Sequence, residues 1–203
     1  MILPSKKLLR SFTLVELLMV VSIITIVAGV TVPSFTGYMK NQTLKNAQDQ
    51  FKNDLRSIEN MALTGSKYDT NVTCGTPPCP ARYWVVKWSG GGTSSTYQTY
   101  LMYDFGTAFE ATCVSLNGGA SQQANYSLPG GITFDRSWSA SGYSTCSNEC
   151  LFFNMQDGST RFVSYASSAC TNTNNKDQVK IVLKNESGST APVSWNRNGM
   201  IGN

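Results

Sequence analysis

The sequence predicts an α+β protein, in which a long N-terminal helix has a membrane-spanning first half and packs its second half on an antiparallel β-sheet domain. Helical spacing of apolar residues continues from residue 12 to about residue 64. Beyond it, the chain consists of short runs rich in aromatic and β-branched residues, bounded by glycine and serine. One helix followed by strands is typical of α+β folds.

The first half of the predicted helix is apolar enough to cross a membrane. Residues 12–32 contain a single charged side chain, that of Glu16. At ~1.5 Å per residue these 21 residues form a helix roughly 30 Å long, which matches the hydrocarbon core of a bilayer. Lys6, Lys7 and Arg10 lie just before it. The positive-inside rule therefore places residues 1–11 in the cytoplasm and the chain beyond Pro33 outside.

The second half of the helix is amphipathic. Pro33 removes one backbone hydrogen bond, so we expect a kink or a loosened turn there. The helical pattern then resumes and ends near Thr64, where Gly65 can serve as the C-terminal cap. An apolar stripe, with Lys45, Asp49, Lys52 and Arg56 off it, is expected to pack on the sheet; its members are Leu44, Ala47, Phe51, Leu55, Ile58 and Ala62.

Strand patterns occupy much of the remaining chain. The clearest run is residues 178–184, where Val179, Ile181 and Leu183 alternate with residues that are mostly polar. Polar residues 117–125 and 137–148 indicate loops, as does the glycine-rich link of residues 89–96. The predicted strands are residues 82–88, 97–105, 112–116, 131–135, 151–155, 160–165, 178–184 and 192–195.

The six cysteines all follow the membrane helix: Cys74, Cys79, Cys113, Cys146, Cys150 and Cys170. An even number in an exported domain predicts disulfides, and six cysteines allow 15 pairings. We expect two local bridges, Cys74–Cys79 and Cys146–Cys150, which leave Cys113–Cys170 as the long one. Zinc is the alternative, since the two local spacings suit metal ligands, but the chain has no histidine and the compartment is oxidising.

Two features set the N-terminal segment apart from an ordinary membrane anchor. A carboxylate inside an apolar span costs a few kcal/mol, so Glu16 is a functional candidate, with snorkelling to the headgroups as the simpler interpretation. An ordinary secretory signal is cut after its apolar region, at small residues. Here the small residue, Ser11, lies before the apolar region, between the basic leader and Phe12.

The run Ser-Phe-Thr-Leu-Val-Glu-Leu-Leu at residues 11–18 resembles the prepilin leader junction of type IV pilins and type II secretion pseudopilins. The resemblance implies that prepilin peptidase cuts between Ser11 and Phe12 on the cytoplasmic face and that the new amino terminus of Phe12 is N-methylated. Counted from Phe12, Glu16 and Pro33 both match family positions, whereas Ser11 stands where the family usually has glycine.

This resemblance also implies a domain organisation. Residues 1–11 are the leader peptide, 12–33 the transmembrane and filament-core helix, 34–65 the second half of that helix, and 66–203 an extracytoplasmic β-rich globular domain. Within the family, the likeness is greatest to minor pilins and pseudopilins of the GspH/FimT group. Diffuse motifs carry that likeness, at residues 51–62, 129–134 and 193–201.

The function implied is that of a structural minor subunit of a type IV pilus or a type II secretion pseudopilus. Before assembly, it would be a single-pass inner-membrane protein with its globular domain in the periplasm or outside the cell. Its partners would be other pilin or pseudopilin subunits, prepilin peptidase, the inner-membrane assembly platform and the membrane itself. In the filament, Glu16 would neutralise the methylated amine of a neighbouring subunit's Phe12, because an unpaired charge is costly in an apolar core.

Two alternatives belong to other functional classes. One is a DNA-binding minor pilin for natural transformation, although residues 193–203 offer only Arg197 as a basic residue. The net charge of +4 includes three basic residues of the leader, so the rest of the chain carries 13 Lys and Arg against 12 Asp and Glu. The other is a pilus-tip adhesin that stacks aromatic side chains on sugars, with candidates Trp84, Trp88, Trp138 and Tyr143.

An enzyme is not expected. The chain has no histidine, so the usual serine or cysteine triad lacks its imidazole base. Neither a Walker loop nor a dinucleotide-binding glycine motif follows a predicted strand, and no Asp-rich calcium loop is present. We therefore expect no cofactor and no metal. The acids Asp104, Glu110, Asp135 and Asp157 are interpreted as solvated residues near turns, with Asp157-Gly158 as a hairpin turn.

Overall fold

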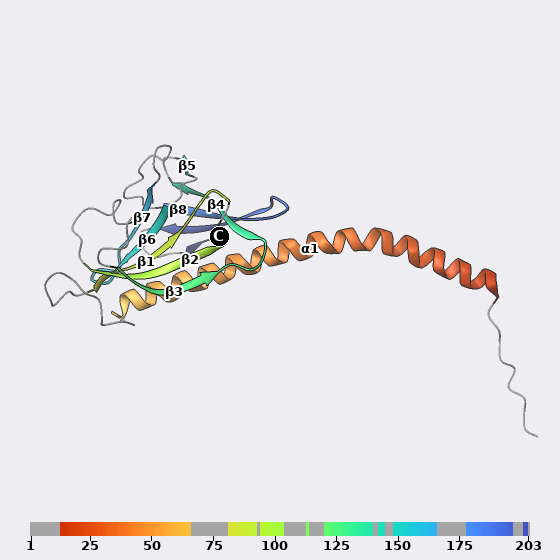
Figure 1. The fold of residues 1–203 in the computed structure, drawn as a ribbon, viewed down its shortest axis with the longest axis horizontal. Helices are drawn as coiled ribbons and strands as arrows, with labels where there is room; N and C mark the ends of the chain where they lie inside the picture. Colours follow the sequence, from red (N-terminus) through yellow and green to blue (C-terminus); the bar gives the residue numbers. More distant parts are fainter. Residues whose placement is uncertain are drawn as a thin grey trace, which may run out of the picture. The chain divides into compact units, whose positions relative to one another are not determined.

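The computed structural model describes residues 13–65, 81–92, 94–103, 113, 120–139, 142–144, 148–165, 178–196 and 201–202. Within these residues, one helix precedes a series of strands, so the predicted α+β class is confirmed (Figure 1). The elements are α1 (Leu14–Leu63), β1 (Ala81–Trp88), β2 (Thr96–Tyr103), β3 (Ala120–Ser127), β4 (Ile132–Ser139), β5 (Gly142–Ser144), β6 (Asn148–Asn154), β7 (Thr160–Tyr165), β8 (Gln178–Asn185), β9 (Thr190–Asn196) and β10 (Ile201–Gly202).

The chain divides into two compact units, Met1–Met39 and Lys40–Asn203. The N-terminal part of α1 belongs to the first unit, and the rest of α1 belongs to the second unit with all the described strands. The helix continues through the position of Pro33, whose side chain lies outside the description, so the expected kink stays a prediction.

The end of α1 follows the prediction. The helix ends at Leu63, and Gly65 adopts a φ of 65°, the left-handed conformation that glycine takes at low cost. The backbone N–H of Thr64 donates to the carbonyl of Asn60 at 2.9 Å, and that of Gly65 donates to Ala62 at 3.2 Å. These bonds satisfy carbonyl groups that the end of a helix leaves without partners.

The described strands form two antiparallel sheets. The first sheet has the order β3-β2-β1-β6-β7, and the second has the order β10-β9-β8-β4-β5. The predicted hairpin of Asp157 and Gly158 joins β6 to β7, with the Ser159 N–H donating to Asp157 Oδ1 at 2.8 Å. Burial along β8 confirms the predicted inner face, since Val179, Ile181 and Leu183 are all buried in the core.

Two predicted loops are wrong. Within residues 117–125, β3 begins at Ala120 and pairs along its length with β2. Within residues 137–148, β4 continues to Ser139, β5 follows, and β6 begins at Asn148. β3 is an edge strand without a fully buried residue, so it needs no apolar alternation and is held by its backbone pairing. The strand predicted at 112–116 lies outside the described residues except for Cys113, which is helical.

The larger hydrophobic core cluster of the described residues joins the second half of α1 to both sheets. All six residues of the predicted stripe are buried, with at most 5% of any of them exposed. Phe51 lies at the centre, in edge-to-face contact with Trp88, Tyr97 and Phe134 at centroid distances of 6.2, 5.1 and 5.3 Å. Lys52, expected off the stripe, is also buried, with 8% exposed. The stripe therefore holds this part of the helix against the strands, as predicted.

Hydrogen bonds also link the two sheets. The glycine-rich link between β1 and β2 docks on β4, where Gly92 N–H donates to Phe134 at 2.8 Å and Phe134 N–H donates to Ser94 at 2.9 Å. Gly92 has a φ of 76°, which strains any residue other than glycine. Elsewhere, the Trp195 indole of β9 donates to Thr160 Oγ1 of β7 at 2.9 Å. The predicted flexible turn is thus a contact between sheets.

Candidate functional site

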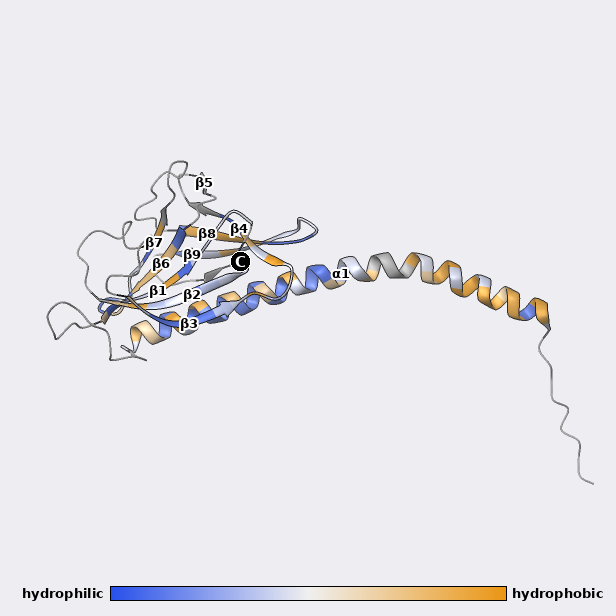
Figure 2. Cartoon of the chain, viewed as in Figure 1, coloured by the Kyte–Doolittle hydropathy of each residue, from blue (hydrophilic) through white to orange (hydrophobic). Residues whose placement is uncertain are grey.

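The N-terminal part of α1 exposes apolar side chains on every side. Among the described residues, α1 is the one helix long and apolar enough to cross a membrane, and its most apolar stretch is not buried at all. Figure 2 shows this stretch almost uniformly hydrophobic, whereas hydrophobic and hydrophilic residues alternate in the part of α1 beyond Lys40. Large apolar side chains here are 48–79% exposed: Leu14, Val15, Leu17, Leu18, Met19, Val20, Val21, Ile23, Ile24, Ile26, Val27 and Val30.

The hydroxyl groups within this apolar stretch are satisfied inside the helix. Ser22 Oγ donates to the Leu18 carbonyl at 2.8 Å, and Thr25 Oγ1 donates to the Val21 carbonyl at 2.7 Å. A polar group without a partner is costly in lipid, and these local bonds avoid that cost. The segment is therefore suited to an apolar surrounding, either a bilayer or a bundle of similar helices.

Glu16 forms a capping box with Thr13 at the start of α1. The Glu16 N–H donates to Thr13 Oγ1 at 3.3 Å, and Glu16 Oε2 accepts from the Thr13 N–H at 3.4 Å. The Thr13 hydroxyl also donates to Glu16 Oε2 at 3.3 Å. A carboxylate near the helix N-terminus is further stabilised by the helix dipole. The Thr-x-x-Glu spacing at residues 13–16 carried this signal, and the sequence reasoning missed it.

The structure leaves open the roles of the other predicted processing and assembly residues. Ser11 and Phe12 are outside the described residues, so cleavage between them and methylation of Phe12 stay predictions. The assembly role of Pro33 stays a prediction as well.

The disulfide of the β domain differs from the expected pairing. Cys113 and Cys150 are bonded to each other, with their Cα atoms 5.9 Å apart. The expected Cys146–Cys150 and Cys113–Cys170 bridges are therefore wrong. β6 begins at Asn148 and turns the side chain of Cys150 toward the face that Cys113 covers, and this is set by strand pairing rather than by distance along the chain. Cys74, Cys79, Cys146 and Cys170 lie outside the described residues.

The bridge lies in a second, smaller hydrophobic cluster of the first sheet. Its buried members are Val85, Met102, Cys113, Cys150, Phe152 and Val163.

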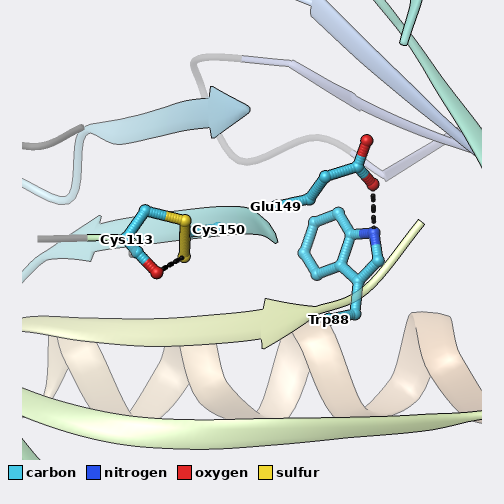
Figure 3. The surroundings of a disulfide bond; sticks show 4 residues. All are labelled: Trp88, Cys113, Glu149 and Cys150. Carbon is cyan, nitrogen blue, oxygen red and sulfur yellow. Dashed lines mark hydrogen bonds between the residues drawn. A yellow bond between two sulfur atoms is a disulfide. The ribbon is translucent and has the colours of Figure 1, made fainter. Parts of the chain in front are cut away.

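Figure 3 shows the disulfide beside the buried pair formed by Trp88 and Glu149. The Trp88 indole N–H donates to Glu149 Oε2, and Glu149 has no exposed surface. A buried carboxylate is costly unless it is hydrogen-bonded, and the indole supplies such a bond.

The aromatic residues proposed for sugar binding do not share one exposed surface, because two of them are buried. Trp84 and Trp88 are 1% and 2% exposed and belong to the main core. Trp88 stacks between Phe134 and Phe162, at centroid distances of 5.9 and 6.0 Å. These two tryptophans cannot also stack on a sugar, so that part of the adhesin alternative is wrong. The side chains of Trp138 and Tyr143 lie outside the description.

The acids considered at the sequence level do not gather into a described site. Asp135 bridges two cations, with Arg136 Nε at 3.2 Å and Lys184 Nζ at 3.6 Å. Asp104 and Glu110 lie outside the described residues. Within the described residues, no group of three or more His, Cys, Asp or Glu side chains is placed to hold a metal ion.

Together, these features define a two-sheet β domain carried on a helix with a membrane-length apolar N-terminal part. No protein-family model, curated protein or solved structure matches the chain.

Proposed function

We propose that the protein is a structural minor subunit of a type IV pilus or a type II secretion pseudopilus, which joins a helical filament through its N-terminal helix. One observation carries the proposal: a single 50-residue helix exposes apolar side chains all round in its first part and buries one apolar stripe in its second. The second part anchors the β domain, and the first part is left for a separate apolar environment.

Hydrophobic burial supports two successive environments for that first part. Each large apolar side chain taken out of water contributes about 1.5–3 kcal/mol, and a dozen of them are exposed along residues 14–30. The inner membrane covers these side chains before assembly, while the β domain remains on the outer side. In the filament, the corresponding helices of other pilin or pseudopilin subunits replace the lipid.

In this proposal, the charge of Glu16 fixes the axial register between neighbouring subunits. In the single chain, its carboxylate accepts hydrogen bonds from Thr13. In the filament, it also faces the methylated amine of Phe12 in a neighbouring subunit. A charge left alone in an apolar core is strongly destabilising, so the pair favours one axial register between neighbouring helices.

The proposal is tested by following processing and assembly of the full chain in its native host. We expect prepilin peptidase to cut between Ser11 and Phe12, which N-terminal sequencing and intact mass of membrane-extracted protein will show together with N-methylation. Filaments sheared from cells, or released from an overexpressed secretion system, should contain the mature chain. A mature chain that starts beyond Val32, or filaments that lack the protein while its membrane pool is normal, would overturn the proposal.

A further inference from the structure

A small pocket opens on the outer face of the first sheet, where the link between β1 and β2 begins. Side chains alternate along a strand, and Trp88 belongs to the main core, so Lys87 lies on the opposite face with Val85. Gln98 pairs with Lys87 across β1 and β2, and Cys150 pairs with it across β1 and β6. The pocket has a volume of about 150 Å³. Apart from the buried Trp88, its described lining is polar: Lys87, Ser89, Ser94, Thr96, Gln98 and Asn148.

Hydrogen bonds within the domain hold this pocket in shape. Ser94 Oγ donates to the Thr96 carbonyl at 3.1 Å and accepts from the Thr96 N–H at 3.3 Å. The Tyr100 hydroxyl donates to Gln98 Oε1 at 2.7 Å, which orients the amide of Gln98 and leaves its NH₂ group to donate elsewhere. The glycine-rich link is bonded to β4, as described above. A pocket that is formed in advance loses less entropy when a ligand binds.

The lining combines one positive charge with several neutral hydrogen-bond donors. Lys87 is the one charged residue among the described residues that line the pocket. Partial burial lowers the pKa of Lys87 below its usual value of 10.5, because desolvation disfavours the charged form. An anion beside the ammonium group offsets that cost. A carboxylate has two oxygens that accept about four hydrogen bonds, so it matches an ammonium surrounded by hydroxyl and amide groups.

We propose that this pocket binds a uronic acid unit of an acidic polysaccharide, with the carboxylate on Lys87. At about 30 Å³ per water molecule, the pocket holds roughly five waters, which leaves room for one ring but not for a drug-sized ligand. The hydroxyl and amide side chains around Lys87 suit a carboxylate that is itself flanked by hydroxyl groups. Because the pocket is open to solvent, the rest of the polysaccharide stays outside.

Other ligands fit the lining less well. A divalent cation prefers carboxylate and carbonyl oxygens, and a lysine side chain repels it. A nucleic acid requires a stripe of several cations, whereas Lys87 is the one cation of the described lining. An apolar ligand finds no apolar wall, since Trp88 is only 2% exposed. A sugar acid needs one cation and several neutral donors, and the pocket supplies both.

Ligand binding by the full chain in detergent micelles tests the assignment. Galacturonate carries both the carboxylate and the ring hydroxyls, galactose lacks the charge, and acetate lacks the ring. Each ligand is titrated and followed by saturation-transfer NMR, with empty micelles as the blank. We expect saturable binding of galacturonate and binding at least about tenfold weaker for galactose and for acetate. Absence of saturable galacturonate binding would overturn the proposal, as would equal binding of galactose or of acetate.

Two substitutions then locate the binding in the pocket. Lys87→Gln removes the charge and should weaken galacturonate binding about tenfold or more. Gln98→Glu keeps an acceptor for the Tyr100 hydroxyl but places a negative charge next to Lys87, so it should abolish binding. Lys180→Gln is the matched control, because Lys180 is also a partly buried strand lysine but lies on β8 of the second sheet. Its replacement should leave the affinity unchanged.

The Tm of each variant separates loss of the ligand from loss of the fold. If Lys87→Gln unfolds the chain, Gln98→Glu decides. Unchanged affinity in Gln98→Glu, or a loss in Lys180→Gln as large as that in Lys87→Gln, would overturn the site.

The pocket is separate from the proposed filament contacts. It lies in the second compact unit, whereas Glu16 and the apolar part of α1 lie in the first. Glu16→Gln should therefore bind galacturonate with the affinity of the wild type, and the result holds whether or not the chain enters filaments. Weaker binding by Glu16→Gln would contradict a site built by the β domain alone.

Discussion

Glu16 caps α1 in the single chain and is proposed to set register in the filament, and different substitutions separate these two roles. Its carboxylate caps α1 together with Thr13, and its charge is proposed to pair with a neighbour's Phe12 amine. Glu16→Gln keeps an oxygen that can accept the capping hydrogen bond but removes the charge. Thr13→Ala removes the capping hydroxyl but keeps the charge.

We therefore expect opposite outcomes for these two variants. Glu16→Gln and Glu16→Ala should insert into the membrane normally and be cleaved, but should enter filaments about tenfold less or worse, while Glu16→Asp should retain part of the incorporation. Thr13→Ala costs only about 1 kcal/mol of helix stability and should assemble nearly normally. Membrane-inserted and filament-incorporated protein are quantified separately at matched expression. Normal incorporation of Glu16→Gln would show that the charge does not set register.

A second prediction concerns the buried pair of Trp88 and Glu149. Glu149→Ala leaves the indole N–H without its acceptor inside the core, which costs about 1–3 kcal/mol. Glu149→Gln keeps an acceptor oxygen and should lose less. Urea unfolding of the full chain in detergent, followed by circular dichroism, measures both. Equal losses in the two variants would mean that the hydrogen bond contributes nothing specific.

At the scale of elements, Phe51 decides how α1 packs on the sheets. Its ring contacts three aromatic residues, one of them in the second sheet. Phe51→Ala should lower the free energy of unfolding by about 3–5 kcal/mol, because it leaves a cavity among rings that cannot collapse into it. Asn41→Ala, on the same helix but exposed, should change the stability by less than about 0.5 kcal/mol. Similar effects of the two variants would contradict the packing described.

Tyr97 links α1 to β2, and its raised pKa is expected to make the free energy of unfolding depend on pH. Its hydroxyl donates to Asp54, and burial, with the carboxylate of Asp54, raises the pKa of Tyr97 well above its usual value of 10.0. Below pH about 10, the phenol is protonated in both the folded and the unfolded chain. Above it, the unfolded chain loses the proton that the folded chain keeps, so the free energy of unfolding falls as the pH rises.

Tyr97→Phe removes this dependence together with one hydrogen bond. The variant should be about 1–2 kcal/mol less stable than the wild type at pH 8, and the difference should shrink at pH 10.5–11. Urea unfolding of both chains across that range measures the difference. A gap between them that widens with pH would contradict the direction of the pKa shift.

At the scale of the whole domain, the Cys113–Cys150 bridge constrains a long stretch of chain. The two residues are 37 positions apart, and closing such a loop is worth about 4 kcal/mol in the chain-entropy account. Cys113→Ala, Cys150→Ala and the double variant should therefore be destabilised by about the same amount, since each breaks the same bond. If the two cysteines belonged to different bridges, the effects of the single variants would add in the double variant.

Much of this protein was determined by local sequence. The apolar run from Phe12, the stripe through Phe51, the cap at Gly65 and the alternation around Ile181 were all predicted, because helix periodicity, strand periodicity and glycine conformation depend on neighbouring residues. The capping box of Thr13 and Glu16 is equally local, and the Thr-x-x-Glu spacing is enough to predict it. The membrane-length helix and the α+β class follow from these patterns alone.

The tertiary structure decided what depends on partners far along the chain. β3 was predicted as a loop because its polar sequence shows no buried face, and only pairing with β2 makes it a strand. The sequence favoured the core for aromatic residues in strands but left Trp84 and Trp88 as candidates for sugar binding, and their burial between the two sheets shows that they belong to the core. Cys150 bonds to Cys113 because strand register turns it toward the covered face of the sheet. Sequence spacing does not encode which strands meet, and the free energy of long-range pairing selects that arrangement.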